Sequence, residues 1–95
     1  MEYLTGNNWC VKGNTISRSL MDFYVDIKQI AAKDHIVSLL SVYKDGCEFF
    51  FSFDNLEEAI SFTQEEVAYS HSIKEVNEKY VDKYIKGKQK TYNNP

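Results

Sequence analysis

The feature that most constrains the fold of this chain is the run CEFFFSF at residues 47–53. Its odd-numbered residues, one cysteine and three phenylalanines, fall on one face of an extended chain because successive side chains of a strand point to opposite sides. Aromatic residues favour the pleated, half-buried positions of a sheet. Phe50, on the second face, indicates that this side is partly covered too. The run therefore predicts a strand that supplies much of the core.

A second apolar run, IVSLLSVY at residues 36–43, comes just before this strand. It is apolar on both faces, which is typical of an interior strand. The tripeptide Lys44-Asp45-Gly46 separates the two runs, and Gly46 can adopt the positive φ that a tight hairpin turn requires. We therefore predict an antiparallel β-hairpin formed by residues 36–43 and 47–53.

An amphipathic helix is predicted for residues 55–69, directly after the aromatic strand. Asp54 is expected to cap its N-terminus, and Glu57 follows three residues later, where a capping box places its acid. Glu58, Ser61 and Glu65 are expected to point into solvent. The apolar stripe follows i, i+3, i+4 spacing and consists of Leu56, Ala59, Ile60, Thr63 and Val67, widened on one side by Phe62 and Tyr69.

A further helix is predicted for residues 73–86. Ser72 is a suitable N-cap, and Gly87 is a natural residue for the C-terminal end. The apolar stripe of this helix consists of Ile73, Val76, Tyr80 and Tyr84.

Residues 15–33 fit two patterns. In the helical pattern, seven apolar residues fall within about 120° of arc: Ile16, Leu20, Phe23, Tyr24, Ile27, Ile30 and Ala31. In the alternative strand pattern, Phe23, Val25 and Ile27 fall on one face, and the alternation breaks at Gln29 and Ile30. The residues on the other face are Asp22, Tyr24, Asp26 and Lys28. Because the helical pattern extends over more residues, we predict a helix here and keep the strand as the alternative.

Together these elements predict an α+β fold in a single domain, residues 1–95. A small antiparallel sheet built on the hairpin packs against two or three helices, in the order β-α-β-β-α-α, and residues 9–12 add a short strand. Residues 1–8 and 88–95 are expected to be loosely ordered ends. A chain of 95 residues can bury a modest core without disulfide bonds.

Charge is distributed unevenly along the chain. The net charge is −3, but residues 45–72 contain seven acids and no lysine or arginine, whereas residues 73–95 contain six bases and three acids. We expect a dipolar molecule with an acidic face beside a basic end. Lysine outnumbers arginine ten to one, and asparagine and tyrosine are frequent, a bias typical of low-GC genomes and of their phages and mobile elements.

The pattern of reactive residues argues against metal binding and catalysis. Cys10, Cys47, His35 and His71 lack the short, paired spacing of zinc ligands. We interpret both cysteines as reduced thiols and place Cys47 in the core. Adjacent glutamates diverge by about 100° on a helix, so they do not form an acid–base pair. We therefore predict no metal, no cofactor and no enzymatic activity.

The cellular setting is predicted from what the sequence lacks. No apolar run approaches the roughly 20 residues that a membrane span needs, and the first residues do not follow the pattern of a signal peptide. The helix with the cleaner apolar stripe is acidic, which disfavours binding to membrane surfaces. We expect a cytoplasmic protein that does not bind membranes.

The predicted function is non-catalytic protein binding. An acidic helix suits a basic partner such as a nuclease or another enzyme that handles nucleic acid. Immunity proteins of toxins and phage-encoded inhibitors of bacterial defence systems work in this general way, and the analogy is one of size and charge. The candidate partner-binding residues are Asp54, Glu57, Glu58, Glu65 and Glu66, with Phe62 or Tyr69 as an aromatic anchor. The competing interpretation is that the acids only keep the protein soluble.

An alternative function is that of a nucleic-acid-binding accessory protein. Its candidate residues are Lys83, Lys86, Lys88 and Lys90, which could contact phosphates without reading the sequence. Base readout favours arginine, and the chain contains a single arginine, Arg18.

Overall fold

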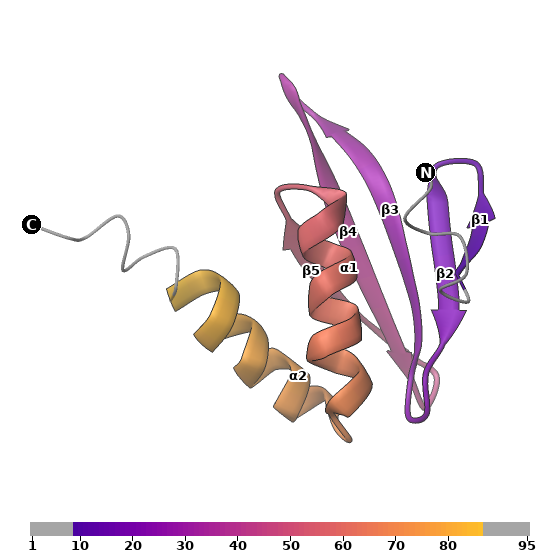
Figure 1. Ribbon diagram of the computed structural model, residues 1–95, viewed down its shortest axis with the longest axis vertical. Helices are drawn as coiled ribbons and strands as arrows, with labels where there is room; N and C mark the ends of the chain where they lie inside the picture. Colours follow the sequence, from indigo (N-terminus) through magenta and orange to yellow (C-terminus); the bar gives the residue numbers. More distant parts are fainter. Residues whose placement is uncertain (1–8, 87–95) are drawn as a thin grey trace, which may run out of the picture.

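The computed structural model describes residues 9–86, in which a five-stranded antiparallel sheet is followed by helices, as Figure 1 shows. The strands lie in chain order, so each one pairs with the next. This architecture confirms the predicted α+β class. The strands are β1 (Cys10–Lys12), β2 (Thr15–Ser19), β3 (Tyr24–Ala32), β4 (His35–Lys44) and β5 (Cys47–Phe53). The helical segments are α1 (Leu56–Glu65), the 3-10 turn η2 (Val67–Tyr69), α2 (Ile73–Lys79) and the π-helical segment η3 (Tyr80–Ile85).

The predicted hairpin is confirmed and is formed by β4 and β5. Lys44 pairs with Cys47 at its closed end, so Asp45 and Gly46 form a two-residue loop. Both have positive φ, 54° and 81°, as a type I′ turn requires. The predicted short strand at residues 9–12 is also confirmed, as β1.

The predicted helix at residues 15–33 is wrong, and the strand alternative is right. The segment forms β2 and β3, which pair through Ile16 and Ile27. Val25 and Ile27 are fully buried, while Tyr24 between Phe23 and Val25 is exposed. Burial therefore alternates with the two-residue period of a strand and not with the spacing of a helix. Pairing with β4 along the whole of β3 supplies backbone hydrogen bonds and apolar neighbours that an isolated helical stripe would lack. Within residues 9–86, five strands therefore precede the first helix.

The core lies between one face of the sheet and α1, which crosses β3, β4 and β5 in Figure 1. The predicted apolar stripe of α1 is buried, including Thr63, whose hydroxyl donates to the carbonyl of Ala59 at 2.8 Å. The buried sheet residues that face α1 include Ile16, Val25, Ile27, Leu40, Val42, Phe51 and Phe53. Because these residues alternate along each strand, they share the face of the sheet that packs on α1, and the residues between them point to the opposite face.

The second predicted helix is confirmed as α2 and η3, which lie beside α1 on the side away from β1 and β2 (Figure 1). Val76 is fully buried, and Tyr80 and Tyr84 pack against the core. The ring centroid of Phe53 lies 5.4 Å from that of Tyr80 and 4.7 Å from that of Tyr84. Together, α2 and η3 therefore cover the core on the side of β5.

The helix caps correct one prediction and confirm another. The N-cap of α1 is Asn55, not Asp54, because the Asn55 side chain accepts a hydrogen bond from the backbone N–H of Glu58 at 2.9 Å. Glu58 rather than Glu57 therefore stands three residues after the cap. Ser72 caps α2 as predicted, accepting from the N–H of Glu75. Gly87, like the ends predicted to be loosely ordered, lies outside the described residues.

Candidate functional site

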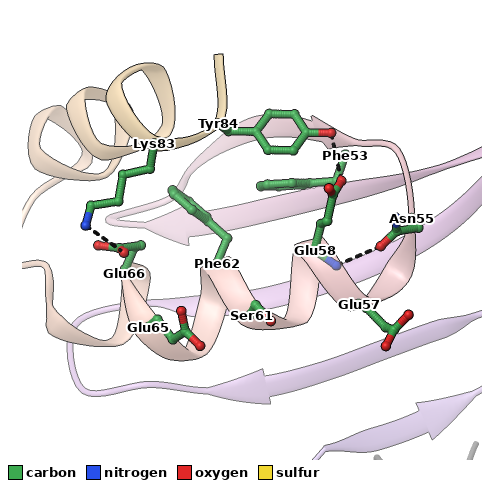
Figure 2. Close-up of a pocket in the computed structure, with 10 residues that line it drawn as sticks. All are labelled: Phe53, Asn55, Glu57, Glu58, Ser61, Phe62, Glu65, Glu66, Lys83 and Tyr84. Carbon is green, nitrogen blue, oxygen red and sulfur yellow. Dashed lines mark hydrogen bonds and ion pairs between the residues drawn. The ribbon is translucent and has the colours of Figure 1, made fainter. Parts of the chain in front are cut away.

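The acidic residues of α1 border an open groove of about 440 Å³ between α1 and η3. Figure 2 shows this groove with its lining residues. The sheet contributes one aromatic residue to it, α1 and its flanking residues contribute most of the wall, and η3 contributes two side chains. The lining consists of Phe53, Asn55, Glu57, Glu58, Ser61, Phe62, Glu65, Glu66, Lys83 and Tyr84.

The glutamates around α1 form two rows, because residues four apart in a helix lie one above the other. Glu57, Ser61 and Glu65 form the outer row, which in Figure 2 points away from η3. Glu58 and Glu66 lie in the inner row and point toward η3. The predicted acidic face is thus two rows with different surroundings.

The outer row presents two carboxylates that are not neutralised within the described part of the chain. Glu57 and Glu65 are both exposed, and neither side chain forms a hydrogen bond or ion pair with another of residues 9–86. They lie two turns apart, about 12 Å along the helix axis at 1.5 Å per residue. Ser61, also exposed, lies between them.

Residues of η3 contact both glutamates of the inner row. The Tyr84 hydroxyl donates to Glu58 Oε1 at 3.0 Å and accepts from the backbone N–H of Asp54 at 2.8 Å. Glu66 Oε2 lies 3.4 Å from Lys83 Nζ. Glu58 is therefore half-buried rather than pointing freely into solvent as predicted, and the protein's own lysine neutralises Glu66.

The two predicted aromatic anchors occupy different places. Phe62 is only 7% exposed and packs against Phe53 and Tyr80, so it forms the floor of the groove as part of the core. Tyr69 is 72% exposed but lies on η2, outside the groove lining. Asp54 is exposed at the start of α1 and also lies outside the lining.

The structure adds Lys83 and Tyr84, which sequence reasoning did not include in the acidic site. Both belong to the second helix, and the contact of Tyr84 with Glu58 spans 26 residues. The i, i+4 spacing of Tyr80 and Tyr84 predicted a packing stripe, but nothing local in the sequence indicates which helix that stripe meets.

The lysines of the alternative site are partly occupied. Lys83 contacts Glu66, and Lys86 Nζ lies 3.4 Å from Asp82 Oδ1. The side chains of both lysines are 61% exposed, so they remain accessible to a nucleic acid. Lys88 and Lys90 lie outside the described residues.

The placement of the cysteines corrects a further prediction. Both are free thiols, as interpreted from the sequence, but Cys47 is exposed at the start of β5, beside the hairpin turn, rather than buried in the core. Within residues 9–86, no three His, Cys, Asp or Glu side chains are grouped so that they could hold a metal ion. None of the helices in that range is both long enough and apolar enough to cross a bilayer.

A comparison with protein-family models finds no match to the chain, and comparisons with curated proteins and with solved structures find no significant match.

Proposed function

We propose that this protein binds a basic protein partner through the groove between α1 and η3 and that it catalyses no reaction. The observation that supports this proposal is the pair of exposed glutamates Glu57 and Glu65, which have no partner among residues 9–86. Two uncompensated carboxylates on a rigid helix attract a cationic surface and speed its encounter. A nuclease or another enzyme that handles nucleic acid has such a surface, so an inhibitor, immunity or anti-defence role in the cytoplasm follows from this proposal.

The inner row of the groove offers the partner a second contact, at Glu66. Lys83 Nζ lies 3.4 Å from Glu66 Oε2, and the side chain of Lys83 is 61% exposed whereas that of Glu66 is 16% exposed, so the lysine can move into solvent while the carboxylate stays in place. A guanidinium from the partner could replace Lys83, because arginine binds a carboxylate through two parallel hydrogen bonds. The ring of Phe62 on the groove floor and the ring of Tyr84 would then cover the apolar part of the arginine side chain.

The second candidate function is nucleic-acid binding through the exposed lysines Lys83 and Lys86. The two functions predict opposite effects of one substitution. Lys83→Ala frees Glu66 and should strengthen capture of a basic protein, whereas it removes a phosphate contact and should weaken binding to nucleic acid.

The experiment compares four proteins as bait in a pull-down: the wild type, Glu57→Lys with Glu65→Lys, Lys83→Ala, and Glu78→Lys. Glu78 is an exposed acid on α2 outside the groove, so its reversal shows what a single charge reversal does away from the groove. We expect a basic protein to be captured by the wild type and by Glu78→Lys, lost with the double reversal, and retained more strongly by Lys83→Ala.

The same proteins are tested by gel shift with DNA and RNA across a salt series. Undiminished capture by the double-reversal variant would refute the groove as the binding surface. Tight nucleic-acid binding that weakens steeply with salt and with Lys83→Ala would favour the second function instead.

A further inference from the structure

The face of the sheet away from α1 carries a second cavity, of about 330 Å³. Strand register places its residues in adjacent rows. Asp26 on β3 is paired with Ser41 on β4 and Ser41 with Phe50 on β5, and the neighbouring row pairs Tyr43 with Glu48. All five of these side chains line the cavity. It shares no lining residue with the groove described above, which lies between α1 and η3.

Two carboxylates in this cavity converge on one phenol. The oxygen of Tyr43 lies 2.7 Å from Glu48 Oε2 and 3.0 Å from Asp26 Oδ2. A phenol has a single hydrogen to donate, so it can satisfy only one of these two acceptors at a time. The other carboxylate oxygen faces the phenolic oxygen without a hydrogen between them. A further N–H donor placed between the carboxylates would supply the missing hydrogen bond.

The excess negative charge at this point is not balanced by the described part of the chain. No lysine or arginine among residues 9–86 forms an ion pair with Asp26 or Glu48. Lys28, two residues along β3 from Asp26, lines the same cavity but does not contact either carboxylate as an ion pair. The site therefore favours a cation.

The floor of the cavity holds a hydroxyl that has no partner. Ser41 is only 4% exposed, yet its side chain forms no hydrogen bond with any of residues 9–86. The Ser41 oxygen atom itself is not fully buried, and the residue lines the cavity, so the oxygen is accessible from it. The Ser41 hydroxyl is therefore positioned to accept a hydrogen bond from a ligand inside the cavity.

An aromatic wall limits the kind of cation that fits. Phe50 and Tyr43 line the cavity, and Phe50 is 57% exposed on this side of β5; Tyr24, outside the lining, packs on Tyr43 with ring centroids 5.7 Å apart. Exposed rings beside carboxylates attract organic cations through their π faces. A hard metal ion would instead need several oxygen ligands around it, and residues 9–86 offer no suitably grouped set.

We propose that this cavity binds a guanidinium group, held between Asp26 and Glu48 and against the Ser41 hydroxyl, with Phe50 along its flat side. A guanidinium has five N–H donors in a fixed plane and can reach two carboxylates and a hydroxyl together, which a single ammonium does less well. The group could belong to a free small molecule or to an arginine side chain, and the two sources share this chemistry.

The test is a titration of the full chain followed by ¹H–¹⁵N NMR at constant ionic strength. The guanidinium probes are agmatine and the blocked peptide acetyl-Gly-Arg-Gly-amide. Tetramethylammonium, which has no N–H donor, and glucose, which has no charge, are the comparators. We expect saturable shifts at the amides of Asp26, Ser41 and Glu48 with a Kd of about 1 mM or tighter, and none at Glu57. Binding of agmatine alone would indicate a free ligand, and equal binding of the peptide would indicate an arginine side chain.

Three substitutions in the cavity and one control in the groove test the residues. Asp26→Asn and Glu48→Gln should each weaken agmatine binding roughly tenfold or more, as expected for the loss of one charged hydrogen-bond acceptor. Lys28→Gln removes a like charge and should tighten binding. Glu65→Gln, the matched charge change in the groove, should leave it unaltered. If Asp26→Asn does not fold, the two exposed positions, Glu48 and Lys28, still give opposite predictions.

The proposal is overturned by the absence of saturable shifts with both guanidinium probes. It is also overturned by unchanged affinity in Glu48→Gln, by equal binding of glucose or tetramethylammonium, or by shifts confined to α1.

Discussion

The hydroxyl of Tyr80 in η3 donates a hydrogen bond to the backbone carbonyl of Ser52 at 2.7 Å. Ser52 lies in β5, which among residues 9–86 pairs only with β4, so no strand of that range meets its outward backbone groups. Two residues further on, the backbone N–H of Asp54 donates to the Tyr84 hydroxyl. The second helix therefore satisfies part of the sheet edge with two tyrosine side chains, which keeps that stretch from pairing with another chain.

The first prediction concerns this contact between helix and sheet edge. Tyr80→Phe keeps the ring against Phe51 and Phe53 but removes the hydroxyl, so the free energy of unfolding should fall by about 1 kcal/mol. Tyr69→Phe removes a hydroxyl from an exposed ring on η2 and should have no measurable effect. Urea denaturation of the three proteins, followed by circular dichroism, measures both changes. Equal stabilities would mean that water replaces the Tyr80 contact without cost.

The second prediction concerns the aromatic centre of the core. Phe53 is 1% exposed and packs against Phe62 and Tyr84, with ring centroids 5.4 and 4.7 Å away. Phe53→Ala should lower the free energy of unfolding by about 3–5 kcal/mol, since it leaves a cavity between the sheet and both helices. Phe50→Ala, on the exposed face of the same strand, is the matched control and should cost much less. Similar losses for both variants would contradict the assignment of the two faces.

The sequence predicted well those elements whose apolar residues fit only one periodicity, either that of a strand or that of a helix. Residues 47–53 alternate at period two and are bounded by a Gly-containing turn, and the stripe of α1 repeats at three and four residues. Phe51, Phe53 and the stripe of α1 are buried as the pattern placed them, whereas Cys47 at the hairpin end of its strand and Tyr69 beyond α1 are exposed. Local pattern was sufficient there because each element meets the core with one face.

The helix prediction for residues 15–33 was wrong for an identifiable reason. The turn at residues 20–23 joins two strands, and reading through it as one segment aligned Ile16, Phe23 and Ile27 on a false helical stripe. The partner that decides the outcome is β4, which follows in the sequence and could not be used by a pattern confined to this segment. For the same reason, the contacts of Lys83 and Tyr84 with α1 were not predictable, because tertiary packing sets them.

The third prediction tests the corrected helix cap. Asn55→Ala removes the acceptor for the N–H of Glu58 and should lower the free energy of unfolding by about 1 kcal/mol. Asn77→Ala makes the same change at an exposed position within α2 and should be neutral or slightly stabilising, because alanine has the higher helix propensity. Thermal unfolding of the two variants compares them directly. A larger loss for Asn77→Ala would show that Asn55 does not act as the cap.

The fourth prediction concerns acid stability. The backbone N–H of His71 donates to Glu75 Oε1 at 2.9 Å, and this hydrogen bond, helped by Lys79, holds the pKa of Glu75 below its ordinary value of 4.5. The folded state therefore binds this proton less readily than the unfolded state, and the contribution to stability is present above pH 4.5 and lost as the pH falls below it. Urea midpoints across acidic pH should decline less steeply for Glu75→Gln than for the wild type. Parallel declines would contradict the role of Glu75.

The fifth prediction concerns alkaline stability and the phenol of Tyr43. Its hydrogen bond to Glu48, its partial burial and its contact with Asp26 all oppose a third negative charge, so they raise the pKa of Tyr43 well above its ordinary value of 10.0. As the pH rises above 10.0, the unfolded chain loses this proton while the folded protein retains it, so the free energy of unfolding must fall with increasing pH. Tyr43→Phe lacks this contribution and should lose stability less steeply, whereas Tyr24→Phe keeps the phenol between its carboxylates and should follow the wild type. Urea midpoints above pH 10.0 measure the three slopes, and a wild-type slope no steeper than that of Tyr43→Phe would show that the two carboxylates do not hold this proton.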